Sequence, residues 1–133
     1  MSFDAQAIFA NLAEKERIKG HHSVEGRAIR ILSRALNGSS SGNLSGRDVL
    51  VLCDQAVTDW LKARLKLSPW STTSLPELLV KAIQAKLITR RDGVRLQKMH
   101  QRRDATDDAR SDLSAAQAQS ALEFCIEVIE KHW

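Results

Sequence analysis

Tyrosine is absent from this chain of 133 residues. Without a phenol, the chain has no tyrosine to act as an acid, a nucleophile or a modification site. Two prolines and six glycines are few for a chain with many tight turns, which disfavours a turn-rich β-sandwich. Hydrophobic residues make up 43% and charged residues 27%, and these fractions are typical of a folded globular domain rather than a disordered chain.

Cysteine is scarce, and long apolar runs are missing. Cys53 and Cys125 lie 72 residues apart, which excludes a CxxC metal or redox motif. Both fall on apolar helix faces, so we expect buried free thiols in a reducing compartment. No apolar run approaches the roughly 18 residues that a membrane span needs, and the N-terminal region has no apolar signal-peptide core. These absences predict a cytoplasmic protein with no membrane partner.

Apolar residues recur at steps of three and four along most of the chain, which predicts helices and no strands. The length suits one domain of about 100–200 residues. We expect a single all-α domain over residues 1–133, a bundle of four to six helices with an up-and-down core. Residues 1–42 would supply N-terminal helices and a loop, and residues 43–133 the core. The expected helices cover residues 3–18, 24–36, 46–66, 74–87, 90–104 and 114 to the C-terminus.

Local signals refine this prediction. Capping patterns mark four helix starts, at Ser45 with Asp48, Ser74 with Glu77, Thr89 with Asp92, and Ser114 with Gln117. The first side chain of each pair can accept from the later backbone N–H. The Gly- and Ser-rich segment 37–43 predicts a flexible loop, the one candidate hinge. Trp60 is expected in the core. Trp70 and Trp133 are expected to pack on an end of the bundle, and the alternative for both is anchoring of an interface or stacking on a base.

Charge is unevenly distributed. The net charge is +4, and within it residues 81–103 carry +7 and residues 104–133 carry −5. A segment this basic can contact phosphates, and its candidate nucleic-acid-binding residues are Arg90, Arg91, Arg95, Lys98, Arg102 and Arg103. The alternative is a solvated helix face whose arginines pair with glutamates of the last helix.

The segment 99–108 combines one histidine, two arginines and three aspartates. His100, Arg103 and Asp104 are the catalytic candidates, because ribose 2′-OH attack needs a base such as imidazole and a cation for the phosphate. His100 and Asp104 are four residues apart on one helix face, and Asp107 and Asp108 follow, which leaves a metal site as a second interpretation. Two further interpretations of this segment are a partner-binding surface and a helix end with a purely structural role.

Other histidines and motifs carry weaker signals. The loop pair His21-His22 is not expected to bind a metal, and His132 is expected beside the negative end of the last helix. The chain has no P-loop, GxGxxG or GxSxG motif, so no cofactor is expected.

Three stretches of the chain share features with a known family. They are AVTDWLK (56–62), SLPELL (74–79) with AKLI (85–88), and LQKMHQRRD (96–104). Through them the chain from residue 46 to 133 resembles a HEPN domain, a small helical module of prokaryotic toxin–antitoxin, abortive-infection and CRISPR-linked proteins. The resemblance implies a homodimer. In the family, an Arg, often followed by Asn, and a His a few residues later form a metal-independent ribonuclease site across the dimer.

The chain departs from the family pattern at two functional groups, the motif His of the ribonuclease site and a Tyr beyond it. Arg103 falls on the motif Arg and Asp104 follows it, but positions 108–110 hold Asp, Ala and Arg where the His is expected. Some relatives carry a Tyr beyond the His that a partner nucleotidyltransferase modifies, and this chain has none. The resemblance therefore implies a non-catalytic module that binds RNA, a nucleotide or a partner protein such as a nucleotidyltransferase. The alternatives are a ribonuclease that uses Arg103 with a non-standard His100, and an adaptor with no nucleic-acid role.

Overall fold

The computed structural model describes residues 7, 10–14, 17, 24–68, 70–105 and 115–132. Every regular element within these ranges is a helix, so the all-α prediction is confirmed. The predictions for His21, His22 and Trp133 lie outside the described residues. The helices are α2 (Val24–Ser41), α3 (Gly46–Arg64), α4 (Leu75–Gln84), α5 (Arg90–Ala105) and α6 (Ala115–Lys131), and residues 10–14 are also helical.

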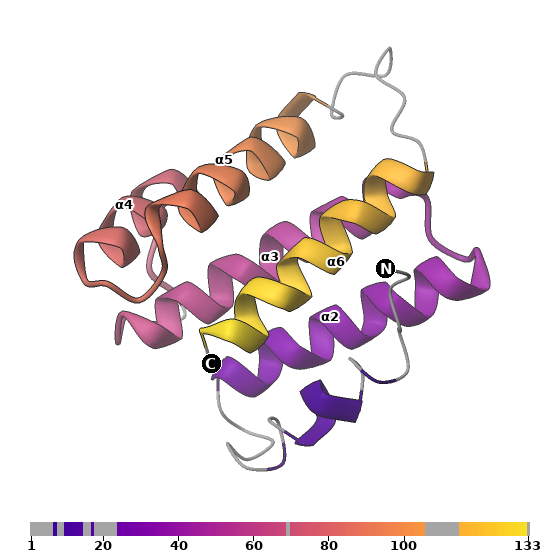
Figure 1. Ribbon diagram of the computed structural model, residues 1–133, viewed down its shortest axis with the longest axis horizontal. Coiled ribbons are helices and arrows are strands. Elements are labelled where there is room, and N and C mark those ends of the chain that lie inside the picture. The colour runs from indigo at the N-terminus through magenta and orange to yellow at the C-terminus, as the bar shows by residue number, and fades with distance from the viewer. Residues whose placement is uncertain are drawn as a thin grey trace.

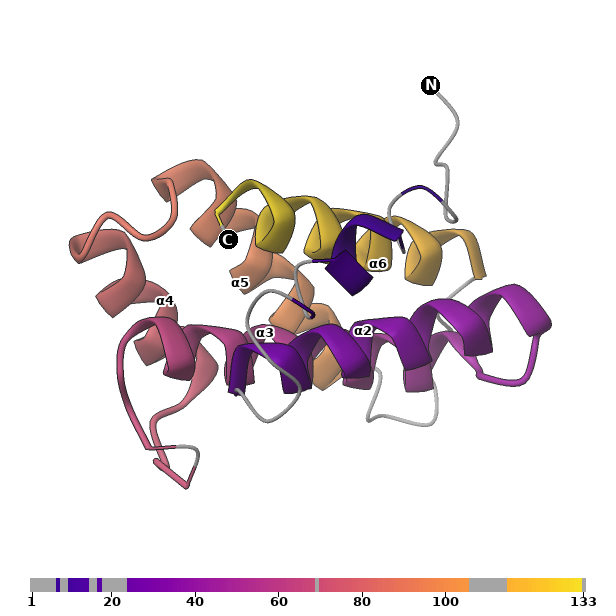
Figure 2. The same cartoon turned by 90° about the horizontal axis from the view of Figure 1, so that it is seen from below.

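The four long helices alternate in direction along the chain (Figure 1), as the up-and-down prediction requires. α2 and α3 form one layer, and α6 lies over it (Figure 2). α3 is the central helix, because it contacts α2, α4, α5 and α6. None of the helices in the described ranges combines the length and the apolar character that crossing a membrane requires.

The core is built around α3. Its apolar positions form a wide stripe, and the side chains of Cys53 and Trp60 in that stripe are fully buried. The predicted place of Trp60 is therefore confirmed. Leu12, from the helical residues 10–14, is also fully buried in this core, so this part of the N-terminal region docks on the bundle.

Three of the four predicted helix starts are confirmed, and the fourth, at Ser114, lies outside the described residues. The Ser45 hydroxyl accepts from the backbone N–H of Asp48 at 3.1 Å, and the Ser74 hydroxyl accepts from that of Glu77 at 3.4 Å. Thr89 Oγ1 accepts from the N–H of Asp92 at 3.1 Å. Each bond satisfies a donor that the first turn of a helix leaves without a partner, which contributes about 0.5–2 kcal/mol.

The predicted hinge at 37–43 is wrong for most of its length, because α2 continues to Ser41. The helix ends at Gly42, whose φ of 75° lies in the left-handed region, and the N–H of Asn43 donates to the carbonyl of Gly38 at 3.0 Å. A Cβ at Gly38 would clash with the side chain of Leu44. Glycine costs about 1 kcal/mol in a helix, but at this position it leaves room for the side chain of Leu44.

Trp70 does not pack on the bundle as expected, because it is 89% exposed. It lies in a turn in which the N–H of Ser71 donates to the carbonyl of Ser68 at 2.9 Å and the N–H of Trp70 donates to the Ser68 hydroxyl at 3.2 Å. These local bonds leave the indole in solvent.

Candidate functional site

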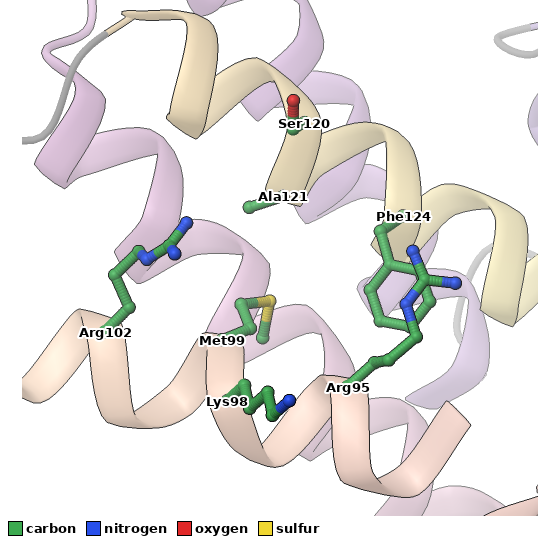
Figure 3. A pocket seen from close by; sticks show the side chains of 7 residues that line it. All are labelled: Arg95, Lys98, Met99, Arg102, Ser120, Ala121 and Phe124. Carbon is green, nitrogen blue, oxygen red and sulfur yellow. The ribbon is translucent and has the colours of Figure 1, made fainter. Parts of the chain in front are cut away.

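Three of the predicted basic residues meet at one groove. Arg95, Lys98 and Arg102 are spaced by three and four residues, so they share a face of α5. They line a groove of about 230 Å³ between α5 and α6, shown in Figure 3. In Figure 2 the two helices diverge toward the C-terminal end of α5. The geometry therefore concentrates positive charge where the bundle is hollowed.

The floor of this groove is apolar. Met99 from α5 and Ala121 and Phe124 from α6 line it, and their side chains point into the gap between the two helices (Figure 3). Met99 and Phe124 are only 6% and 8% exposed. Ser120 and Ala121 are small, so the wall formed by α6 leaves room for a ligand. The groove thus has cationic side chains above an apolar floor.

Arg95 is held in place by an aromatic ring. Its guanidinium carbon lies 3.8 Å from the centroid of the Phe124 ring, which is cation–π contact. A planar guanidinium has its N–H donors in its own plane, so stacking on a ring leaves them directed sideways. The contact therefore orients Arg95 and keeps its donors in position to bind an anion.

The neighbouring hollow, at the N-terminal end of α5, has mixed charge. Arg91 and Lys131 line it together with Asp92 and Glu127. Asp92 is 5% exposed; its carboxylate Oδ2 accepts from Lys131 Nζ at 3.3 Å and lies 2.9 Å from His132 Nε2. His132 directly follows the last residue of α6, at the end of the helix as expected, and its ring pairs with Asp92. The carboxylates make this hollow a poorer anion site than the groove beside it.

The environment of Asp92 also shifts its pKa. Burial is the largest single influence and raises the pKa, but the hydrogen bonds from His132, Lys131 and Thr89, with the charge of Lys131, together outweigh it. The pKa of Asp92 is therefore lowered from its usual value, and the group is ionised at neutral pH. An ionised Asp92 joins the start of α5 to the end of α6.

His100 faces another helix. Its Nδ1 lies 2.8 Å from Oδ1 of Asp54 in α3, and the two side chains are 17% and 14% exposed. Arg102 instead lines the groove against α6, so the structure separates these two members of the predicted constellation. The side chains of Arg103 and Asp104, and the residues Asp107 and Asp108, lie outside the described part of the chain.

The two thiols are buried and free, as predicted. Cys125 donates from its Sγ to Met99 Sδ at 3.0 Å. A hydrogen bond with Cys53 and burial both raise the pKa of the Cys125 thiol well above its usual value. The thiol therefore stays protonated and unreactive.

Within the ranges that the structure describes, no group of three or more His, Cys, Asp and Glu side chains is arranged to hold a metal. Arg90 is exposed at the start of α5 and lies outside the groove lining. The residues that sequence reasoning missed are Ser120, Ala121 and Phe124, the α6 wall of the groove. Their one signal in the sequence is the run of small residues at the start of α6.

Comparison with known proteins gives no relative from which a role could be transferred. No family model matches the chain, and no curated protein or solved structure matches it either.

Proposed function

We propose that the chain is a non-catalytic, HEPN-like helical module that acts as a dimer and binds RNA through the groove between α5 and α6. The setting that the resemblance implies is prokaryotic defence or toxin–antitoxin function. One observation carries the RNA-binding part: Arg95, Lys98 and Arg102 converge on a single groove, and none of the described residues that line it is a carboxylate. Phosphates are the anions that RNA presents in a regular row, and arginine binds them through paired donors.

The absence of catalysis rests on two features. The motif His is missing from the sequence, and His100 lies against Asp54 of α3 instead of beside the groove cations. Purified protein is therefore expected to leave RNA intact. RNA degradation that disappears in an Arg103→Ala variant would contradict this part of the proposal.

Salt dependence of RNA binding tests the proposal directly. For single strands, the slope of log affinity against log salt falls by about 0.7 for each phosphate contact that is lost. The triple variant Arg95→Gln, Lys98→Gln, Arg102→Gln is therefore expected to reduce that slope by about 0.7 if the three cations share one phosphate, and by about 2 if each holds its own. The measurement is fluorescence anisotropy of a labelled single-stranded RNA at several salt concentrations.

A matched control removes the same charge elsewhere. Arg27, Arg34 and Lys66 are exposed and lie outside the groove, so the corresponding triple Gln variant is expected to lower affinity slightly at all salt concentrations. Equal effects of the two triple variants would show that net charge, and not the groove, attracts RNA. Failure of the wild-type protein to bind RNA at low salt would overturn the proposal.

A second function is favoured by one observation. Val80 and Val94 are 55% and 48% exposed and line an apolar groove of about 420 Å³ between α4 and α5. An exposed apolar groove is typical of a protein-binding surface, so the alternative is an adaptor that binds a protein partner. Val80→Gln with Val94→Gln, which leaves the net charge as it is, would then abolish partner or self-association, measured by light scattering, while RNA binding stays unchanged.

A further inference from the structure

The groove between α5 and α6 combines two kinds of surface that one ligand class matches. We propose that it binds a single nucleotide of a single-stranded RNA, with the base on the apolar floor and the phosphate on the surrounding cations. The floor is Met99, Ala121 and Phe124, and the cations are Arg95, Lys98 and Arg102. This inference rests on the proposed RNA binding and names the part of RNA that the groove recognises.

The size of the groove limits the ligand. Pockets for drug-sized molecules are usually about 300–1,000 Å³, and this groove is about 230 Å³. It therefore holds one base with its ribose phosphate, and the rest of a strand continues over the exposed surface of α5. That surface carries further basic residues, Arg91 among them.

The contact between Arg95 and Phe124 gives the groove a stacking surface. One face of the guanidinium lies on the Phe124 ring, with 3.8 Å between the guanidinium carbon and the ring centroid. Nucleic-acid bases stack on arginine planes as well as on aromatic rings. Arg95 is exposed, so the other face of its guanidinium extends the floor of Met99 and Ala121 as a stacking surface for the base, while its in-plane donors reach the phosphate.

The same geometry favours single-stranded RNA over duplex RNA. In a duplex the faces of the bases are covered by their neighbours, whereas an unpaired base can leave the stack and lie on a protein surface. The apolar floor gains contact only with such a base. A duplex of equal length offers the cations the same phosphates but cannot fill the floor.

Small ligands separate the contribution of the base to affinity from that of the phosphate. Nuclear magnetic resonance titrations of the full chain with adenosine 5′-monophosphate, ribose 5-phosphate and inorganic phosphate measure the affinity with and without a base. Stacking contributes about fivefold or more per base, so adenosine 5′-monophosphate is expected to bind at least about fivefold more tightly than ribose 5-phosphate. Both should shift the amide signals of Met99, Ala121 and Phe124.

Ala121→Leu tests the floor itself. Ala121 is only partly buried and borders the groove, so a larger side chain fills the space for the base without entering the packed core. This variant is expected to reduce the affinity for adenosine 5′-monophosphate to that for ribose 5-phosphate. The matched control is Ala116→Leu, an exposed position on α6 that lies outside the groove lining and is expected to bind like wild type.

The outcomes distinguish this inference from the proposed function. If the nucleotide binds no more tightly than ribose 5-phosphate, or if duplex RNA binds as well as single-stranded RNA, the nucleotide site is wrong, and salt-dependent RNA binding still stands. If Ala121→Leu leaves the base preference unchanged, the base lies elsewhere and the inference fails. If no RNA binds at low salt, the proposed function fails with it.

Discussion

Nδ1 of His100 lies 2.8 Å from Oδ1 of Asp54, and this contact joins α5 to α3. Both side chains are mostly buried, at 17% and 14% exposure. A buried polar group that loses its partner keeps its desolvation cost, which is about 1–3 kcal/mol. The pair therefore stabilises the position of the helix that carries the groove cations.

Asp54→Ala is expected to lower the free energy of unfolding by about 1–3 kcal/mol, because it leaves the imidazole with one partner fewer. Asp54→Asn is expected to cost less, since its amide oxygen can still accept from Nδ1. Urea denaturation followed by circular dichroism measures both. A double-mutant cycle with His100→Ala isolates the pair, and we expect a coupling energy of about 0.5–3 kcal/mol. A coupling energy near zero would show that the contact adds nothing to stability.

Trp60 anchors the centre of the core, where it is fully buried. Trp60→Ala is expected to lower the free energy of unfolding by about 3–5 kcal/mol, through lost contacts and the cavity left behind. The indole Nε1 has no hydrogen-bond partner within the described residues, so Trp60→Phe loses no bond and should cost roughly 1–2 kcal/mol. Denaturant unfolding of the Phe variant gives a result even if the Ala variant does not fold.

Trp70 provides the matched comparison, because it is 89% exposed. Trp70→Ala is expected to change the free energy of unfolding by less than about 0.5 kcal/mol. A cost similar to that of Trp60→Ala would contradict the exposed position of Trp70.

Lys86 ends α4 in an unusual conformation for a lysine, with a φ of 59°. The N–H of Leu87 donates to the carbonyl of Ala82 at 2.9 Å, and that of Lys86 donates to Ile83 at 3.1 Å, which is the Schellman pattern that normally has glycine at this position. Lys86→Gly is therefore expected to raise the free energy of unfolding by up to about 1 kcal/mol, because it removes left-handed strain.

Lys81→Gly is the control for that variant. Lys81 lies within α4 and is also exposed, so this change removes the same charge from the same helix at a position with ordinary helical geometry. It is expected to cost about 1 kcal/mol. Thermal unfolding of the two variants should therefore shift in opposite directions, and a shift of the same sign would refute the role of the backbone angle.

Local features of the sequence predicted more of this fold than of its site. The capping pairs at Ser45, Ser74 and Thr89 act over three residues, so their spacing in the sequence was sufficient to predict where these helices begin. The end of α2 was mispredicted because glycine and serine are typical of loops, whereas Gly38 lies inside the helix with the side chain of Leu44 against it, a contact that composition does not reveal. Trp70 was mispredicted because bonds within its own turn, and not its hydrophobicity, determine its exposure.

The candidate site depends on how two helices lie relative to each other. Sequence identified Arg95, Lys98 and Arg102 as basic, but periodicity cannot say which helix faces them. Phe124 becomes part of the site only because α6 passes beside α5. The same spatial information separates His100 from Arg102, which are only two positions apart in the chain.

The ion pairs of Asp92 predict how stability responds to acid. The pKa of Asp92 is lowered from a usual value of 3.8, so the folded state binds its proton less readily than the unfolded state does. The stabilisation is therefore fully present above that value and is lost as pH falls through the folded-state pKa. Asp92→Asn is expected to lower the free energy of unfolding at neutral pH by about 1–3 kcal/mol, and its difference from wild type should shrink below about pH 4.

Asp48→Asn is the matched control for this experiment. Asp48 follows the capping residue Ser45 by three positions, as Asp92 follows Thr89, but Asp48 is exposed. Its substitution is expected to have a smaller effect at neutral pH, since an exposed charge at a helix start contributes about 0.3–1 kcal/mol. Urea denaturation of wild type and both variants from pH 3 to pH 7 makes the comparison. A difference between wild type and Asp92→Asn that stays constant into acid would show that His132 and Lys131 do not stabilise the ionised carboxylate.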